Sequence, residues 1–383
     1  MKLFHLSDLH IGLKLMNYDL KEDQKWILDQ IIREADLEQP DAVLIAGDIY
    51  DKAVPSAEAV ELLDYFIDRI RSVVPNAALM LISGNHDSAS RINCFSSLLK
   101  RNNVHIVGFP PREPDEYIEK VTLQDDFGKV HFYLLPFVKP SMVKQITGTD
   151  KNGNNLTYNE AVKALIDRET INTEERNVIV SHQFYIPKGS NADEVERSDL
   201  EIRTVGNIDE VSSEILDIFD YAALGHIHKP MEAGSHKIRY CGTPIACSVS
   251  EANQKKGIIV VELTTKKEEP FIRTIPLSPL RSIKIIKGTL EEILTQSCED
   301  YVTLTLTDTP SKDVFDTQDR LRAAFPYLLE IRRENVKIPD YSVTANEAEL
   351  LNPYELCCSF LKDVDETEKE ILKDVINTVW EEE

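Results

Sequence analysis

Residues 42–48 read Ala-Val-Leu-Ile-Ala-Gly-Asp, a run of five apolar residues followed by a glycine and a carboxylate. An uninterrupted apolar run of this length is typical of a strand that is buried on both faces of a sheet. The glycine lets the backbone turn sharply, and the carboxylate then stands at the carboxyl end of the strand. Open α/β sheets carry their ligand crevices at this end. The stretch therefore predicts both an α/β fold and the position of a site.

The same alternation of short apolar runs and helical patterns continues through about the first 275 residues. Strands are expected at residues 3–6, 42–46, 79–82, 104–107, 130–135, 178–180 and 221–224. Helices are expected at residues 18–37, 56–73, 91–102 and 158–168. Pro40 and Pro75 follow the first two of these helices, where a stop is expected. The pattern predicts an α/β domain in which a sheet is covered by helices.

The pattern changes near Pro276-Leu277-Ser278-Pro279. Beyond it we expect a small β-α-β-α-β unit, formed by strand 281–287, helix 290–294, strand 301–307, helix 314–324 and strand 327–333. The remaining tail is acidic and helical in pattern. We therefore divide the chain into a main domain at 1–276, a small α/β domain at 277–342 and a helical tail at 346–383.

The chain has 383 residues, and 66 acidic against 43 basic residues leave a formal charge of -23. A strongly acidic surface repels phosphates unless metals or a partner intervene, so charge alone does not recruit nucleic acid. With 42% hydrophobic and 28% charged residues, the composition is that of an ordinary globular protein, which excludes wholesale disorder.

The sequence also bears on location. It contains no run of about 18 apolar residues, so a transmembrane helix is not expected. Residues 1–8 have too short an apolar stretch, and charge too soon, for a signal peptide. The six cysteines form no CxxC pair and no framework spacing, which favours reduced, mostly buried thiols. We therefore expect a cytoplasmic protein.

Metal-binding side chains follow five of the predicted strands, each just beyond the strand end. The groups are Asp8-Leu9-His10, Gly47-Asp48, Gly84-Asn85-His86-Asp87, Ser181-His182 and Gly225-His226-Ile227-His228. Imidazole and carboxylate together suit divalent ions such as Mn, Fe or Zn, and the lack of cysteine argues against a structural zinc site. A lone histidine is more often a core residue, which is how we interpret His5, His105, His131 and His236.

Strand geometry supports a shared site. Residues i and i+2 of a strand point to the same side, so Asp8 and His10 are expected to face one ion. His226 and His228 are expected to do the same from a second strand end. A single carboxylate such as Asp48 can bridge two cations about 3.5 to 4 Å apart. The five groups together predict a divalent-metal centre.

In this order, the five groups resemble the motifs of the calcineurin-like metallophosphoesterases. Within that superfamily the chain is similar to a branch of bacterial nuclease subunits. The similarity lies in the residues around the motifs, in the segments 240–244 (Tyr-Cys-Gly-Thr-Pro) and 255–257 (Lys-Lys-Gly), and in the added small domain. The resemblance implies a layered β-sandwich flanked by helices, with a small α/β capping domain and a C-terminal helix-loop-helix.

The resemblance further implies two metal ions, usually manganese in this branch. The first ion is then expected to be held by Asp8, His10, Asp48 and His228. The second is expected to be held by Asp48, Asn85, His182 and His226. Two cations in such a site can neutralise a phosphodiester, activate a water and stabilise the leaving oxygen.

His86 and Asp87 are the expected catalytic residues. Side chains of adjacent residues diverge, so His86 is expected to stabilise or protonate the transition state rather than share an ion with Asn85. Asp87 either orients the His86 ring or is a plain turn carboxylate. Asp51 is expected to turn the chain toward the next helix, or to support a ligand as a hydrogen-bond acceptor.

The resemblance implies a metal-dependent DNA nuclease subunit, acting as exo- and endonuclease on duplex ends or hairpins in DNA repair, recombination and replication. The alternative is a stand-alone metallophosphatase or small-nucleotide phosphodiesterase on the same core. What separates the two is the chain beyond residue 276, for which a small-substrate hydrolase has no evident need. A scaffold protein with a dead site is disfavoured, because every expected ligand is present.

The resemblance also implies two protein partners. Apolar residues on two helices are expected to pair two subunits into a homodimer, although packing on their own sheet would use the same residues: Leu62, Leu63, Phe66, Phe95, Leu98 and Leu99. The tail is expected to form two helices that bind a coiled-coil ATPase, or else to pack on the protein's own body. The first helix begins at Asn352-Pro353, and Thr367 to Glu370 reads as a capping box for the second.

Overall fold

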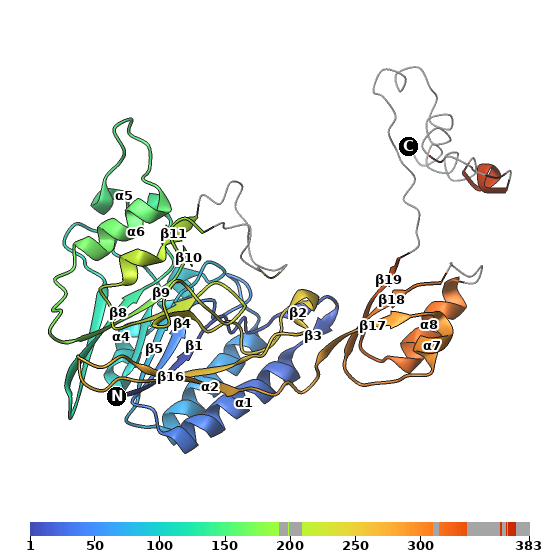
Figure 1. Cartoon of the computed structure of the whole chain (residues 1–383), viewed down its shortest axis with the longest axis horizontal. Helices are drawn as coiled ribbons and strands as arrows, with labels where there is room; N and C mark the ends of the chain where they lie inside the picture. Colours follow the sequence, from blue (N-terminus) through green and yellow to red (C-terminus); the bar gives the residue numbers. More distant parts are fainter. Residues whose placement is uncertain are drawn as a thin grey trace.

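The computed structural model describes residues 1–190, 198, 209–308, 314–334, 361, 365 and 367–372, with side chains from 317 onward in the stretch 314–334. Two six-stranded sheets stack on each other and carry helices on their outer faces (Figure 1). A smaller three-stranded unit stands to one side of this body. Among the described residues, no helix is long and apolar enough to cross a membrane.

The first sheet has the strand order β16-β15-β1-β4-β5-β6. Its four parallel strands are β1 (Lys2–Leu6), β4 (Ala42–Ala46), β5 (Ala78–Ile82) and β6 (Val104–Val107). Two antiparallel strands extend it, β15 (Gly257–Glu262) and β16 (Phe271–Pro276). Helices α1 (Lys21–Glu38) and α2 (Ala57–Val73) pack on the outer face, where Ile31 and Phe66 share one apolar core with Val43 and Ile45.

The second sheet has the order β13-β14-β12-β9-β8-β7. Its strands are β7 (Glu119–Asp125), β8 (Gly128–Leu135), β9 (Arg176–His182), β12 (Tyr221–Gly225), β13 (Met231–Glu232) and β14 (Ile238–Tyr240). Helices α5 (Pro140–Thr147) and α6 (Tyr158–Asp167) cover its outer face, and the short pair β10 (Phe184–Ile186) and β11 (Glu210–Ser212) adjoins it.

The continuous apolar runs arise because the central strands are buried on both faces of the sheet. In β4, Leu44 and Ala46 face the core between the sheets, whereas Val43 and Ile45 face the helices. Both faces therefore require apolar side chains, and the run cannot alternate with polar residues. The predicted α/β fold of layered sheets flanked by helices is confirmed, and all seven strands expected in the main domain are present.

Two predicted helices differ from the structure. Residues 18–19 form the short strand β3 (Tyr18–Asp19), which pairs with β2 (Lys14–Leu15), so α1 begins only at Lys21. The helix expected at 91–102 is divided into α3 (Ala89–Ile92), α4 (Ser96–Leu99) and the 3₁₀ turn η1 (Lys100–Asn102). Phe95 lies between the two helices with φ 61°, a left-handed conformation that a continuous helix cannot contain.

The residues expected to pair two subunits fall into two groups. Leu62, Leu63 and Phe66 are buried in the chain's own core against the first sheet, so packing on their own sheet accounts for them. Phe95 and Leu98 are instead 70% and 55% exposed, and Leu99 is partly buried against the core. Among these six residues, the exposed apolar side chains therefore lie in the α3–α4 segment.

The expected β-α-β-α-β unit is present. It comprises β17 (Ile283–Gly288), α7 (Leu290–Leu294), β18 (Tyr301–Leu306), α8 (Val314–Ala324) and β19 (Leu328–Arg333). The strands are parallel, and the unit has its own apolar core around Leu304 and Phe325. Asp23 of α1 joins it to the main body by accepting hydrogen bonds from Arg281 (2.9 Å) and from the Tyr301 hydroxyl (3.0 Å).

Most of the predicted tail lies outside the described residues, including its first helix. Residues 367–372 are helical, as predicted for the second. The capping box is formed by Asp365 rather than Thr367, because the Asp365 carboxylate accepts from the Glu368 N–H and Glu368 accepts from the Asp365 N–H, both at 2.9 Å. The carboxylate two residues earlier thus caps the helix in place of the expected hydroxyl.

A buried ion pair in the second sheet is tied to the first sheet at the end opposite the strand-end motifs. Arg176, at the start of β9, makes two hydrogen bonds to Asp125, at the end of β7, and a third to the Leu263 carbonyl beyond β15. The amino group of Met1 also lies 2.8 Å from Asp125. The guanidinium is only 3% exposed, so its charge depends on this carboxylate.

Replacing Asp125 with Asn should destabilise the fold by about 3 kcal/mol, because it leaves a buried guanidinium without its counter-charge. Urea unfolding measures the loss, with Asp126→Asn, an exposed neighbour, as the control. Arg176 and the Met1 amine hold the pKa of Asp125 well below its usual range, although burial alone would raise that pKa. The contribution of the Asp125 carboxylate to the free energy of unfolding is therefore complete near neutral pH, and it is lost as the pH falls below about 4. Equal stability of the two variants would contradict this role.

Candidate metal centre

The five motif groups meet at one edge of the sandwich. Asp8, Asp48 and Asn85 follow the ends of β1, β4 and β5 in the first sheet, and His182 and His226 stand at the ends of β9 and β12 in the second. All these strands present their carboxyl ends at this edge, because they run parallel within each sheet. The sequence pattern correctly predicts that the groups converge.

The local backbone differs from the expected strand alternation. Asp8 and His10 lie beyond β1, with φ 52° and 42°, and His226 lies beyond β12 with φ 109°. Asp48 also has a left-handed backbone, with φ 47°. Their side chains are therefore aimed by turns and not by the i, i+2 geometry of a strand. Such conformations disfavour side chains with a Cβ and cluster at functional sites, where surrounding contacts hold them.

Backbone hydrogen bonds between loops hold these turns. The N–H groups of Asp8 and His10 donate to the carbonyls of Gly47 and Asp48, each at 3.0 Å. The carboxylates bind the remaining loops, because Asp8 accepts from the His226 N–H (3.0 Å) and Asp48 accepts from the His86 N–H (2.9 Å). The loops of both sheets are thus locked together through the two carboxylates.

Two glycines permit this close approach. A Cβ on Gly84 would lie 2.1 Å from Oδ1 of Asp48, and a Cβ on Gly225 would lie 1.9 Å from the Ala46 carbonyl oxygen. Both distances are far inside van der Waals contact. Only glycine fits at these two positions, so the glycines flanking the motifs serve packing as well as turning.

One cluster of potential ligands is formed by Asp8, His10 and His228, whose ligand atoms lie within 4.8 Å of one another. The Nε2 atoms of His10 and His228 are 3.1 Å apart, and Asp48 Oδ2 lies 3.8 Å from the His10 nitrogen. All three residues of the cluster are buried. Burial lowers the pKa of His10 to about 3, so its ring is neutral and has a lone pair to offer a metal.

A second cluster is formed by Asp8, Asp48 and His182, again within 4.8 Å. His182 donates its Nδ1 proton to the Ala46 carbonyl at 2.8 Å, which directs Nε2 toward Asp48 Oδ2 (3.3 Å) and Asn85 Oδ1 (3.0 Å). His226 Nδ1 lies 2.9 Å from the same Asn85 oxygen. Nitrogen and oxygen donors thus converge on one point, which suits a divalent cation.

The electrostatics of this cluster also favour a cation. Burial would lower the pKa of His182, but the Asp48 carboxylate outweighs it and raises that pKa to about 9. Burial raises the pKa of Asp8. Burial would also raise the pKa of Asp48, but the charge and hydrogen bond of His182 outweigh it and bring that pKa below its usual range. Without a metal, a proton on His182 balances part of the negative charge of the two carboxylates. A divalent ion would replace that proton.

Of the two roles expected for Asp87, its hydrogen bonds favour that of a turn carboxylate over orientation of the His86 ring. Both Asp87 oxygens accept from backbone N–H groups, those of Ile49 (3.0 Å), Tyr50 (2.9 Å) and Gly84 (2.9 Å). His86 instead donates its Nδ1 proton to the carbonyl oxygen of Asp51 at 3.0 Å. Asp87 therefore behaves as a turn carboxylate that joins two loops, and the main chain of Asp51 orients the catalytic candidate.

Two buried polar residues escaped the sequence reasoning. Gln24 of α1 donates to the His10 carbonyl (2.7 Å) and accepts from the Gly12 N–H (3.0 Å), which fixes the loop that carries His10. Glu251 is fully buried and accepts from His228 Nδ1 at 3.2 Å. Both residues stand among other polar residues in the sequence, so no local pattern indicates that they are buried beside the site.

All four histidines interpreted as structural have partners away from the metal centre, and His105 Nε2 lies 3.2 Å from Asn103 Oδ1. His5 crosses between the sheets, bonding the Tyr221 hydroxyl (2.8 Å) and the Leu224 carbonyl (3.1 Å). His131 lies 2.7 Å from Glu175, and His236 pairs with Glu269 at the surface. Their contacts are those of core and surface residues.

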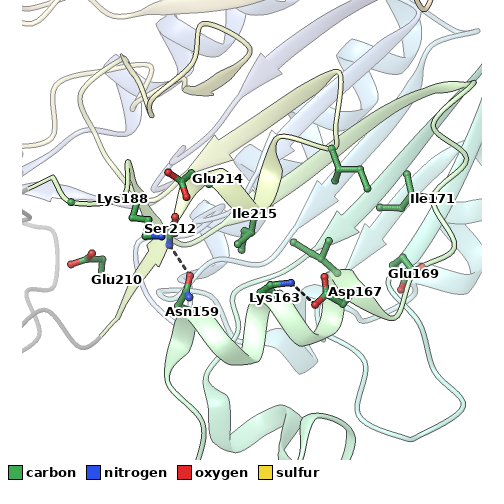
Figure 2. Close-up of a pocket in the computed structure, with 13 residues that line it drawn as sticks. Asn159, Lys163, Asp167, Glu169, Ile171, Lys188, Glu210, Ser212, Glu214 and Ile215 are labelled. Carbon is green, nitrogen blue, oxygen red and sulfur yellow. Dashed lines mark hydrogen bonds and ion pairs between the residues drawn. The ribbon is translucent and has the colours of Figure 1, made fainter.

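A cavity of about 850 Å³ lies away from the metal centre, between α6 and the segment around β11 (Figure 2). Its walls carry both charges, including Lys163 and Asp167, which are paired at 2.5 Å. None of the predicted ligands lines it. Size therefore does not identify the site in this molecule, whereas the donor set at the strand ends does.

Comparison with known proteins bears on this site. Residues 1–230 match the family described as calcineurin-like phosphoesterase. Two curated relatives are named as the SbcD component of the nuclease SbcCD. The one from Staphylococcus epidermidis is 29% identical over 340 residues, covering 86% of this chain and 85% of the relative. The one from Staphylococcus saprophyticus is 33% identical over 301 residues, covering 78% of this chain and 75% of the relative.

Among solved structures, a dimetal phosphatase from Danio rerio is similar over 72% of this chain and 98% of that chain. The identity is 11% and the TM-score 0.36, which is too low to support an inference.

The chain belongs to the calcineurin-like phosphoesterase family. It is therefore a phosphoesterase of a family that uses divalent metals, and its donor clusters fit such ions. The more specific resemblance is confirmed as well, because the curated relatives are SbcD proteins that match most of both chains.

Proposed function

We propose that this chain is a metal-dependent DNA nuclease subunit that works with an SbcC-like coiled-coil ATPase. The observation that carries the proposal is the pair of donor clusters that share Asp8 and both lie close to Asp48, whose Oδ2 is 3.8 Å from His10 Nε2 and 3.3 Å from His182 Nε2. They occur in a chain 33% identical to a relative named as the SbcD component of a nuclease. Exo- and endonuclease action on duplex ends or hairpins, in DNA repair, recombination and replication, is the specific form of the proposal. The remaining alternative is a stand-alone metallophosphatase or small-nucleotide phosphodiesterase.

We propose the ligand sets expected from the motifs. Asp8, His10, Asp48 and His228 would hold one ion, and Asp48, Asn85, His182 and His226 the other. Both ions are proposed to be Mn²⁺, which mixed nitrogen and oxygen donors accept readily. When bound, two such ions neutralise the phosphodiester, activate water and stabilise the leaving oxygen. Asn85 contributes an oxygen without negative charge, which leaves the site more positive toward phosphate.

The chain's own groups would handle the proton. With Nδ1 of His86 donating to the Asp51 carbonyl, Nε2 is the atom left to give or take a proton at the reacting phosphate. Asp87 supports this geometry by holding the His86 loop against the loop that follows Asp48. A groove of about 420 Å³ begins beside Asp51 and carries both charges, those of Lys14, Lys21 and Lys52 and those of Asp19, Asp51 and Glu58.

The function is tested with linear duplex DNA in the presence and absence of Mn²⁺. The wild-type chain should cleave it only with the metal, and Asp48→Asn, which keeps the side-chain shape but weakens both donor clusters, should abolish cleavage. Asp68→Asn, on the exposed face of α2, is the matched control and should retain activity. Hydrolysis of mononucleotides or phosphomonoesters without cleavage of DNA would support the alternative instead.

The role of His86 is tested separately. His86→Ala should still bind two Mn²⁺ ions per chain, yet cleave DNA roughly 100-fold more slowly, because it removes a proton donor and not a ligand. Metal content and single-turnover rates provide the two measurements. His236→Ala, at an exposed histidine, serves as control. Loss of one ion from the His86 variant would instead assign His86 to the ligand set.

We propose that the protein is a homodimer that pairs through the α3–α4 segment, because Phe95 and Leu98 are large exposed apolar side chains there. Sedimentation at high micromolar concentration should give a dimer for the wild type and a monomer for Phe95→Asp. Leu37→Asp, which changes an exposed apolar residue on α1, should leave the dimer intact. A monomeric wild type under these conditions would be the contrary result.

We propose that the tail at 346–383 binds the ATPase, with the small α/β domain at 277–342 as a separate unit. A chain ending at residue 345 should retain Mn²⁺-dependent cleavage and lose co-purification with the ATPase, since an amphipathic helix pair would supply the apolar contact. Pull-down and nuclease assays on the same preparation measure both. Retained binding at full affinity, or unfolding of the truncated chain, would place the tail in the protein's own core. A cytoplasmic location accords with these partners.

A further inference from the structure

A compact polar cluster lies behind His228, on the side away from the metal centre. At its middle is Glu251, which ends the 3₁₀ turn η5 (Val249–Glu251) and is fully buried. Its Oε1 lies 3.2 Å from His228 Nδ1, and its Oε2 accepts from the Thr243 hydroxyl (3.0 Å) and from Lys256 Nζ (2.6 Å). A buried carboxylate with this many donors is held in one orientation.

The contact determines which nitrogen of His228 carries the proton. A carboxylate that already accepts from an ammonium and a hydroxyl acts as an acceptor, so Nδ1 of His228 must donate. The lone pair is then on Nε2, the atom that faces His10 Nε2 at 3.1 Å in the first cluster. A histidine that binds a metal through one nitrogen commonly donates the other N–H to a carboxylate in this manner.

Lys256 holds His228 through the main-chain carbonyl of that histidine. Its Nζ donates to the His228 carbonyl (2.9 Å), to Glu251 Oε2 (2.6 Å) and to Gln254 Oε1 (2.8 Å), which uses all three of its protons. The backbone of Lys256 is anchored in turn, because its carbonyl accepts from the Leu277 N–H at 3.0 Å. The ring and the backbone of His228 are therefore fixed by one ion pair.

The cluster could be mistaken for a third metal site, since ligand atoms of His228, Cys247 and Glu251 lie within 4.8 Å of one another. The ammonium of Lys256 already neutralises the carboxylate and lies in hydrogen-bond contact with it. A further cation beside this ammonium would be repelled. A role in positioning His228 fits the arrangement better than a role in binding an ion.

We propose that Glu251, supported by Lys256, is a positioning residue that orients His228 and fixes its Nδ1–H tautomer for the first metal position. This inference rests on the proposed two-metal function and deepens it. It attributes part of the metal affinity of one position to Glu251 and Lys256, which would not contact the ion themselves. Loss of Glu251 should weaken that position by roughly 10- to 100-fold and leave the second position unchanged.

The test uses the full chain stripped of metal and titrated with Mn²⁺ by calorimetry. Glu251→Gln should lower the affinity of one ion only, Glu251→Asp should restore it in part, and Glu61→Gln, on the exposed face of α2, should behave as wild type. If the unpaired Lys256 prevents folding of the first variant, the double variant Glu251→Gln with Lys256→Met removes both charges together. It should show the same selective loss.

A second readout does not depend on metal. Nitrogen-15 NMR of the imidazoles in the metal-free chain should show His228 as the Nδ1–H tautomer in the wild type and as a mixture in Glu251→Gln. Unchanged affinity for both ions and an unchanged tautomer in a folded variant would overturn the inference. A wild type that binds fewer than two ions would overturn the proposed function instead, so the two failures are distinguishable.

Discussion

Asp8 and Asp48 are buried carboxylates, exposed by 0% and 2%, and a buried negative charge is stable only when positive charge and hydrogen bonds compensate for it. Backbone N–H groups of His226 and His86 donate to these carboxylates, and His182 supplies charge when no ion is bound. The loops of both sheets are therefore arranged so that hydrogen-bond donors and positive charge face these two carboxylates. A divalent cation satisfies it more completely than a proton, which is why the family's metal chemistry suits this edge of the sandwich.

The sandwich delivers the two carboxylates from one sheet and the imidazoles His182, His226 and His228 from the loops of the other. At the opposite end, the pair of Arg176 and Asp125 in the second sheet is tied to the first sheet through the Leu263 carbonyl and the Met1 amine. The relative position of the sheets is therefore set at both ends, by an apolar core between them and by charges at the edges. The left-handed backbone of Asp8, His10 and Asp48 is tolerated because these surroundings hold it.

The sequence predicts the strands and the residues that converge, because strand burial and strand-end position leave strong local patterns. It does not predict how the residues converge. Strand alternation predicts that Asp8 and His10 lie close together, and they do, but turns beyond β1 bring them together. The partner of the His86 ring is a main-chain carbonyl, that of Asp51, and a carbonyl has no signature in sequence.

Long-range contacts explain the other omissions. Glu251 reaches His228 only after the chain has returned through β13 and β14, and Gln24 reaches the His10 loop from the middle of α1. The strand β15 pairs with β1 across more than two hundred residues, so its short apolar run is ambiguous until the sheet is assembled. Each of these contacts depends on tertiary structure that no local pattern encodes.

The central claim is that Asp48 joins two metal positions, and anomalous diffraction from crystals soaked in Mn²⁺ measures it most directly. Two peaks about 3.5 to 4 Å apart are expected, with Asp48 between them, Asp8, His10 and His228 around one, and Asn85, His182 and His226 around the other. A single peak, or two peaks of which Asp48 contacts only one, would contradict it.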